Sequence, residues 1–288
     1  MDVLVLGANG QIGYRLLEQL GSMAKGLTRA DIDLEDDLPK LSEKLDALHP
    51  KVVINAAAFT QVDAAEEYRE QAQQLNTELP SYLARHCAER DLLLVHYSTD
   101  YVFSGQGTEP WKEEDEVAPL NFYGATKWEG EEAIRHNEGR YLILRTSWVY
   151  DSRGNNFLRK ILQVAKERPE LKIVNDQIGS PSWAKDLATH TIQMLSSGKV
   201  GTYHLVNSGY TSWFEFAKEL LSQAKDLNLI ERLPKLTPVN TSEWQSPAAR
   251  PLNSRLSIEK WKADFSSSPR PWQDALKDCL LESAARAT

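Results

Sequence analysis

The chain contains little cysteine, no excess of positive charge and no long hydrophobic run. Its 288 residues include two cysteines, Cys87 and Cys279, too few for a disulfide framework and too isolated for a zinc site. The net charge of -8 argues against nonspecific binding to nucleic acid or to an anionic membrane surface, but not against a small anionic substrate in a locally basic pocket. No membrane-spanning run of about 18 apolar residues occurs, and the chain opens on the apolar run Val3–Leu6 without a charged leader. These absences predict a soluble, cytoplasmic protein with buried, inert thiols.

The hydrophobic pattern predicts an α/β fold. Short apolar runs alternate with segments of helical periodicity, as in parallel βαβ units. The runs are apolar throughout, which indicates a sheet covered on both faces. The predicted strands are Val3–Leu6, Lys25–Thr28, Val52–Asn55, Leu92–Tyr97 and Tyr141–Arg145. The predicted helices are Ile12–Leu20, Leu38–Leu48, Tyr68–Glu89 and Tyr123–His136. This order is typical of a Rossmann-like, doubly wound parallel sheet.

After about Trp148 the pattern changes, and we predict a smaller, mostly carboxyl-terminal lobe. The expected helices are Phe157–Glu167, Trp183–Leu195, Trp213–Gln223 and Pro271–Glu282, and the expected strands are Lys172–Val174 and Thr202–Val206. We therefore expect a dinucleotide-binding Rossmann domain over residues 1–150. Residues 151–288 are expected to form a substrate-binding lobe and to return segments that complete the Rossmann domain.

A glycine-rich turn follows the first predicted strand directly. It reads Gly7-Ala8-Asn9-Gly10-Gln11-Ile12-Gly13, with the spacing G-x-x-G-x-x-G. Glycines at such a turn permit close approach of the backbone to a pyrophosphate and close packing of helix on strand. The amino end of the next helix then offers unpaired N–H groups to the phosphates. The turn predicts a dinucleotide site that uses Gly7, Asn9, Gly10, Gln11, Ile12 and Gly13, although a plain strand–turn–helix has a similar pattern.

The end of the second predicted strand indicates which cofactor binds. An acidic residue there binds a ribose hydroxyl, whereas an arginine accommodates a 2′-phosphate. Arg29 stands at this place, ahead of Asp31 and Asp33, and favours NADP(H), with NAD(H) as an alternative cofactor. The other interpretation of Arg29 is an exposed surface residue.

Small and polar residues follow two further strands. Ala56, Ala57 and Ala58 come after the third strand, where small side chains either let a cofactor lie against the backbone or simply pack. The fourth strand runs into Ser98-Thr99-Asp100. Hydroxyls at this edge can bind a substrate carbonyl or merely cap the strand exit, because doubly wound folds bind ligands at the carboxyl ends of their strands.

Tyr123 and Lys127 lie four residues apart on a predicted helix, which places both side chains on one face. A phenol of pKa about 10 exchanges a proton more readily near neutral pH when an ammonium is adjacent. Such pairs are common in ordinary helices. The glycine turn and the Ser98–Asp100 triplet upstream make a catalytic pair the better interpretation.

Together these motifs resemble the extended short-chain dehydrogenase/reductases and, within them, the branch of dTDP-4-dehydrorhamnose reductases. The two runs specific to this branch are Ser98-Thr99-Asp100-Tyr101-Val102-Phe103 and Arg145-Thr146-Ser147-Trp148-Val149-Tyr150. Further matches are Gly154-Asn155-Asn156-Phe157, Asn175-Asp176-Gln177-Ile178-Gly179, Tyr203-His204-Leu205 and the segment from Arg250 to Leu256. The resemblance covers nearly the whole chain.

The resemblance implies reduction of the C4 ketone of dTDP-4-dehydro-L-rhamnose, a step of dTDP-rhamnose biosynthesis, with hydride from NAD(P)H. By position, Tyr123 matches the proton donor, Lys127 the lysine on the nicotinamide ribose, and Thr99 the hydroxyl partner, with Ser98 beside it. Trp148 matches a residue that contacts the sugar, and Asn156 belongs to another matching motif. Asp33 and Leu34 fall where the adenine is bordered.

Three positions remain open or depart from the pattern. Arg250 either reaches a diphosphate of the substrate or anchors the carboxyl-terminal segment. Some members of the branch bind magnesium at a dimer contact through glutamates, whereas this chain has the cations Arg15 and Lys185 at the matching places. We therefore predict no metal site of this kind, and expect either a monomer or a homodimer.

Two other functions share these motifs. A nucleotide-sugar epimerase or dehydratase has the same Tyr–Lys pair but retains its nicotinamide through each cycle. A non-catalytic regulatory subunit, like that of methionine adenosyltransferase, is similar in sequence and acts by binding a partner enzyme. The presence of Tyr123, Lys127 and Thr99 favours the reductase.

Overall fold

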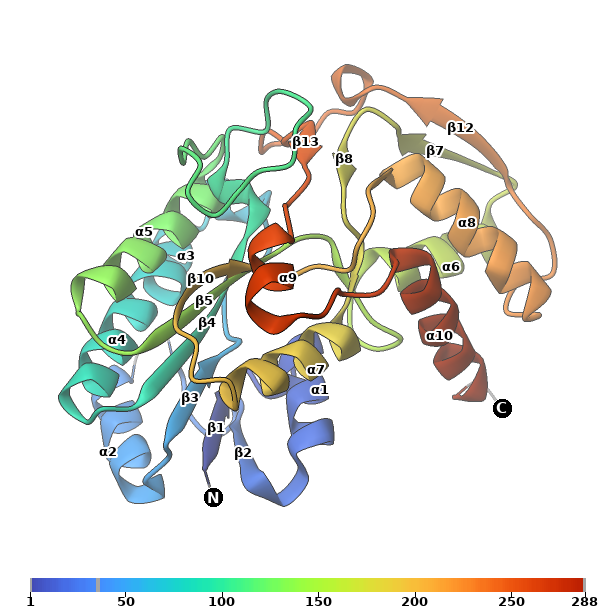
Figure 1. Ribbon diagram of the computed structural model, residues 1–288. Coiled ribbons are helices and arrows are strands. Elements are labelled where there is room, and N and C mark those ends of the chain that lie inside the picture. Colours follow the sequence, from blue (N-terminus) through green and yellow to red (C-terminus); the bar gives the residue numbers. More distant parts are fainter. Residues whose placement is uncertain (1, 35–36, 287–288) are drawn as a thin grey trace.

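The main sheet of the protein has six parallel strands in the order β10-β5-β4-β3-β1-β2. We describe it from a computed structural model that covers residues 2–34 and 37–286 (Figure 1). The strands are β1 Val3–Leu6, β2 Ala24–Leu27, β3 Val52–Asn55, β4 Leu93–Thr99, β5 Tyr141–Thr146 and β10 Gly201–His204. The strand order reverses between β1 and β3, and ligands of doubly wound folds bind outside the carboxyl ends of the strands at such a point. The predicted Rossmann-like fold class is thus confirmed.

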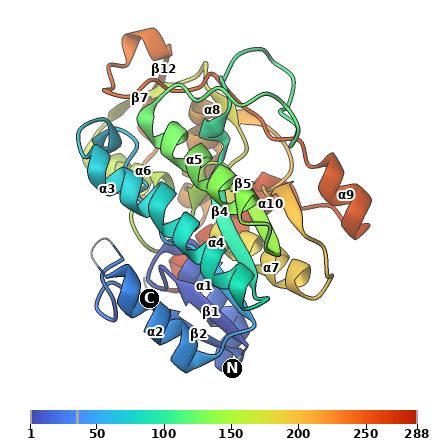
Figure 2. The ribbon, with the colours of Figure 1, turned by 90° about the vertical axis from the view of Figure 1, so that its left-hand side faces the viewer.

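Helices cover both faces of this sheet, which explains the uninterrupted apolar strands. Val3 and Val5 of β1 pack toward one face with residues of α1 (Gln11–Leu20) and α7 (Ala184–Leu195). Leu4 and Leu6 alternate to the other face, where they meet α2 (Leu38–Leu48) and α4 (Leu79–Glu89). Figure 1 shows α1 and α7 side by side, and Figure 2 shows α4 and α5 (Phe122–His136) over the opposite face.

The predicted helix Tyr68–Glu89 is interrupted by a π turn. The structure has α3 Arg69–Gln73, the π turn η3 Gln74–Glu78 and then α4. Within this turn the amide of Asn76 bonds the backbone N–H and C=O of Phe59 and the hydroxyl of Thr126. These tertiary contacts hold the wider turn, and periodicity alone could not reveal it.

A second apolar cluster lies beside the main sheet. Helices α6 Phe157–Glu167, α8 Trp213–Asp226 and α10 Trp272–Ala285 pack around it with the two-stranded sheet of β7 (Glu170–Val174) and β12 (Lys235–Val239) (Figure 1). The pattern missed β12, whose Pro238 is unusual in a strand, and the short helix α9 Glu259–Phe265.

The remaining elements are short. The two-residue strands are β6 Val149–Tyr150, β8 Ile178–Gly179, β9 Ser182–Trp183, β11 Thr211–Ser212 and β13 Asn253–Ser254. The 3-10 turns are η1 Gly21–Met23, η2 Ala64–Glu66, η4 Asp100–Val102 and η5 Thr241–Glu243. No helix within the described residues is both long and apolar enough to cross a membrane. Strand β10 belongs to the main sheet and α7 packs against it, although both follow residue 150. The division into two domains at that residue stays a prediction.

Candidate active site

The glycine turn links β1 to α1 in a conformation that requires glycine. Gly7 has a φ of +74°, and a Cβ there would lie 2.7 Å from the backbone of Ala56 and Ala57. A Cβ on Gly13 would overlap the carbonyl oxygen of Gly7. Helix α1 begins after Gly10 without a side-chain cap, so no capping side chain pairs with the N–H groups of its first turn. The turn therefore provides the close backbone approach and the helix amino end that a pyrophosphate needs.

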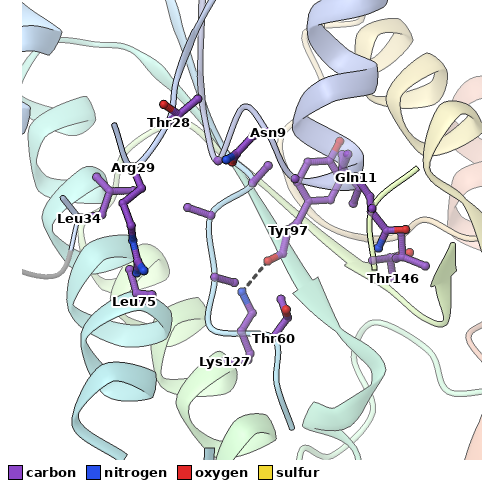
Figure 3. A pocket seen from close by; sticks show the side chains of 18 of the residues that line it. Asn9, Gln11, Thr28, Arg29, Leu34, Thr60, Leu75, Tyr97, Lys127 and Thr146 are labelled. Atoms are coloured by element: carbon purple, nitrogen blue, oxygen red, sulfur yellow. Dashed lines mark hydrogen bonds between the residues drawn. The ribbon is translucent and has the colours of Figure 1, made fainter. Parts of the chain in front are cut away.

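A cavity of about 480 Å³ opens beside this turn at the carboxyl edge of the sheet. Figure 3 shows Thr28, Arg29, Leu34 and Leu75 at one end and Gln11 and Thr146 at the other, with Lys127 in between. The cavity thus extends from the end of β2 to the end of β5, across the point where the strand order reverses.

Most of the predicted cofactor residues line this cavity. They are Gly7, Asn9, Gly10, Gln11, Ile12, Arg29, Leu34, Ala56, Ala57, Ala58, Tyr123 and Lys127. Of the predicted substrate residues, Ser98 and Tyr123 line it. The structure thus places these residues around one cavity, while their roles stay predictions.

Six predicted residues lie outside the lining, and four of them contact or adjoin a lining residue. Gly13 is buried in α1 against Gly7. Asn156 caps α6 and donates to the amide oxygen of Gln11 at 2.9 Å, so it holds a lining residue in place. Thr99 forms a side-chain hydrogen bond with the lining residue Tyr123, and Trp148 precedes the lining residue Val149. The other two are Asp33 and Arg250.

Tyr123 stands in the first turn of α5, whose amino end is capped by Asn121. Its ring meets that of Tyr101 edge-on, with centroids 5.6 Å apart. Burial raises the pKa of the Tyr123 phenol, and a hydrogen bond with Thr99 opposes the rise only in part. The expected lowering of this pKa by an adjacent ammonium is therefore wrong, because Lys127 is not among the groups that shift it and removal of the phenolate from water dominates. The phenol is protonated at neutral pH, which is the form that a proton donor needs.

The hydroxyls of Ser98 and Thr99 both donate to carboxylates. Thr99 donates to Asp100 at 3.1 Å and accepts the backbone N–H of Tyr101 at 3.2 Å. Ser98 donates to the buried Glu131, which Arg145 also binds through two nitrogens. Ser98 is thus fixed at the cavity wall by Glu131.

Lys127 is 2% exposed and points into the sheet. Its ammonium nitrogen lies 2.7 Å from the carbonyl oxygen of Tyr97, the bond drawn in Figure 3, and 3.1 Å from Nε2 of His96. Burial lowers the pKa of Lys127 to about 7, against the opposing influence of Glu131. The charge of this lysine therefore changes within the neutral range.

The predicted substrate residues Trp148 and Arg250 are fixed by contacts beside the cavity. Trp148 has a φ of +49° and stacks on Trp213 with ring centroids 3.6 Å apart. Arg250 binds the carboxylate of Asp63 at 2.7 Å and lies 3.4 Å from the hydroxyl of Tyr101. This pairing supports the interpretation of Arg250 as an anchor of the carboxyl-terminal segment, and its contact with a substrate stays a prediction.

Several lining residues carried no signal of their own in the sequence. They are Thr28, Ile32, Thr60, Leu75, Tyr97, Thr146, Val149, Gly154 and Asn155. Thr146, Val149, Gly154 and Asn155 belong to the matched motifs and could have been found there. Leu75 lies on the π turn, which could not be predicted from the sequence because the tertiary contacts of Asn76 hold it.

Arg15 and Lys185 both bind Glu282 of α10. Arg15 is fully buried and also pairs with Asp151 through Nε at 2.8 Å, and Lys185 lies 3.4 Å from the Glu282 carboxylate. The described residues contain no group of three or more His, Cys, Asp or Glu side chains placed to hold a metal ion. Both positions thus hold cations that pair with an acidic side chain of α10.

Comparisons with known proteins agree with this geometry. The family model described as "RmlD substrate binding domain" matches residues 1–285. The dTDP-4-dehydrorhamnose reductase of Salmonella typhimurium is 40% identical over 98% of both chains. The spore coat polysaccharide biosynthesis protein SpsK of Bacillus subtilis is 38% identical over 97% of both.

Solved structures give the same result. The dTDP-4-dehydrorhamnose reductase of Bacillus anthracis, in complex with NADP, superposes with a TM-score of 0.92 at 33% identity over 98% of this chain and 100% of that one. The UDP-glucose 4-epimerase of Thermus thermophilus, with a TM-score of 0.81 at 18% identity over both full chains, shares the fold alone. Matched over nearly its whole length by sequence and by structure, the chain belongs to the RmlD substrate binding domain family, that of the dTDP-4-dehydrorhamnose reductases.

Proposed function

We propose that the protein reduces the C4 ketone of dTDP-4-dehydro-L-rhamnose to dTDP-L-rhamnose with NADPH. The observation that carries this proposal is the single cavity that joins the glycine turn to Ser98, Tyr123 and Lys127. The 40% identity to a named reductase and the likeness to an NADP complex support it.

The residues present fit a nicotinamide dinucleotide. Gly7, Gly10 and the first turn of α1 would hold the pyrophosphate, because the backbone can approach there and the helix amino end favours anions. Thr28 and Arg29 line the cavity at the end of β2, where a 2′-phosphate would lie. Lys127 would hold the nicotinamide ribose. The bound nicotinamide supplies the hydride.

Tyr123 supplies the proton that the reduced carbonyl requires. As negative charge develops on the C4 oxygen, a phenol held in the protonated form can donate to it, and such general acid catalysis is typically worth about 10²–10⁴ in rate. Thr99 would orient the phenol through the hydrogen bond between their side chains. In its ammonium form, Lys127 adds positive potential where the alkoxide forms.

The decisive experiment supplies the full chain with dTDP-4-keto-L-rhamnose and NADPH or NADH. We expect stoichiometric loss of the absorbance of the reduced nicotinamide, with dTDP-L-rhamnose identified by NMR. Turnover of a nucleotide sugar with only catalytic nicotinamide would indicate an epimerase or dehydratase instead. Absence of any turnover, together with stoichiometric capture of a partner enzyme, would indicate the regulatory subunit.

A further inference from the structure

His96 is a fully buried imidazole that the proposed mechanism does not use. It lies in the middle of β4, is 0% exposed and is not part of the cavity lining. Its two ring nitrogens contact Asn55 at the end of β3 and Lys127 on α5. A polar side chain in this position must find partners, because an unsatisfied buried donor or acceptor is costly.

The hydrogen bonds of Asn55 show which nitrogen of His96 accepts and which one carries the proton. The amide oxygen of Asn55 accepts the backbone N–H of Ala57 at 3.2 Å. The amide nitrogen of Asn55 therefore faces Nδ1 of His96, at 3.1 Å, and must donate to it. Because Nδ1 is the acceptor, a neutral His96 carries its proton on Nε2.

This tautomer places an N–H donor against the side-chain nitrogen of Lys127. The two nitrogens are 3.1 Å apart, and Lys127 already donates to the carbonyl oxygen of Tyr97 at 2.7 Å. An ammonium has three donors and no acceptor, whereas an amine has a lone pair that can accept from Nε2. The bonds thus run in one direction, from Ala57 through Asn55 and His96 to Lys127, only when Lys127 is uncharged.

The other charged groups around Lys127 do not impose this form. Glu131, on the same helix, favours the ammonium, but Arg145 and Arg135 bind its carboxylate. On elements packed against α5, Glu66 of η2 accepts the backbone N–H of Phe122, and Gln73 of α3 binds Glu129. On η4, the charge of Asp100 raises the pKa of Tyr123.

We propose that Asn55 and His96 are positioning residues that bias Lys127 toward its uncharged amine and thereby place the alkaline limit of the reduction near neutral pH. The claim about the alkaline limit rests on the proposed function, whereas the claim about the tautomer of His96 does not. Burial of Lys127 acts in the same direction as the hydrogen bonds. Because the ammonium is lost as pH rises, turnover of the wild type should fall above the neutral range.

The tautomer is tested directly by NMR on the full chain with isotope-labelled histidine ring nitrogens. The chain has six histidines, and the His96 signals are assigned by their loss in His96→Gln. We expect a neutral ring with its proton on Nε2 throughout the neutral range. A proton on Nδ1, or on both nitrogens, would overturn the proposal whether or not the protein is a reductase.

The pH limit is tested with Asn55→Asp, a nearly isosteric change. A carboxylate accepts from both Ala57 N–H and Nδ1–H of His96, so Nε2 becomes an acceptor and the Lys127 ammonium is favoured. The alkaline limb of the kcat profile should move up by about one pH unit or more. The control is Asn228→Asp, which adds the same charge at an exposed position. The proposal would be overturned if the alkaline limb of the kcat profile lay at the same pH in Asn55→Asp as in Asn228→Asp.

Discussion

At the scale of single residues, Tyr123 carries the sharpest prediction. Tyr123→Phe removes the proton but keeps the ring, so kcat should fall by about 10²–10⁴, while NADPH binding is retained. The checks are nicotinamide absorbance for turnover and fluorescence titration for binding. Tyr68→Phe, at a tyrosine that is 48% exposed, is the matched control and should leave both unchanged. Near-normal turnover of Tyr123→Phe would contradict the assignment of the proton donor.

Arg29 is the residue expected to distinguish the two cofactors. A charge-assisted hydrogen bond contributes about 1.5–3 kcal/mol, so Arg29→Ala should raise the KM for NADPH roughly ten- to a hundredfold. The KM for NADH should change little, because NADH has no 2′-phosphate. Arg85→Ala, at an exposed arginine of α4, serves as the control. Equal losses with both cofactors would show that Arg29 supports the fold instead.

At the scale of elements, the junction of β1 with α1 depends on Gly13. In an open helix Gly→Ala is stabilising by about 1 kcal/mol. At Gly13 the added methyl overlaps the carbonyl oxygen of Gly7. We therefore expect Gly13→Ala to lower the free energy of unfolding and to weaken NADPH binding, as measured by denaturant unfolding and cofactor titration. A variant as stable as the wild type would contradict the close packing of this turn.

The elements also show what local patterns can predict. The predicted and observed ends of strand β1 coincide at Val3–Leu6, because both faces are buried and the next residue is a glycine at positive φ. The π turn in the predicted helix Tyr68–Glu89 is not predicted by the local pattern. It is held by contacts of Asn76 with Phe59 and Thr126, which lie in distant parts of the chain.

At the scale of the whole molecule, Glu282 links α10 to the main sheet. Burial alone would raise its pKa, but hydrogen bonds from Arg15 and Ser152 lower it from 4.5 to about 2. A depressed carboxyl pKa stabilises the folded state above the unfolded-state value, and that contribution is lost as pH falls toward 2. As pH falls from 4.5 toward 2, the free energy of unfolding of Glu282→Gln should therefore decrease less than that of the wild type, as measured by acid unfolding. Glu67→Gln, at an exposed glutamate, should follow the wild type.

The Arg15–Glu282 pairing also bears on metal ions. Since Arg15 and Lys185 already bind Glu282, added Mg²⁺ or a chelator should change neither turnover nor the unfolding temperature. Equilibrium dialysis that found stoichiometric, activity-linked Mg²⁺ would contradict this. Whether the protein is a monomer or a homodimer stays a prediction, to be measured by sedimentation with and without Mg²⁺.

The amino-acid sequence was enough to predict the strands, the glycine turn and the Tyr123–Lys127 pair, because each depends on residues that are near one another along the chain. Apolar periodicity, glycine spacing and the four-residue helical repeat are all local. The folded structure was needed to show that Lys127 bonds Tyr97 and His96, that Arg250 pairs with Asp63, and that burial raises the pKa of Tyr123. Hydrogen-bond direction and desolvation depend on atoms brought together from distant segments, and no spacing in the chain records them.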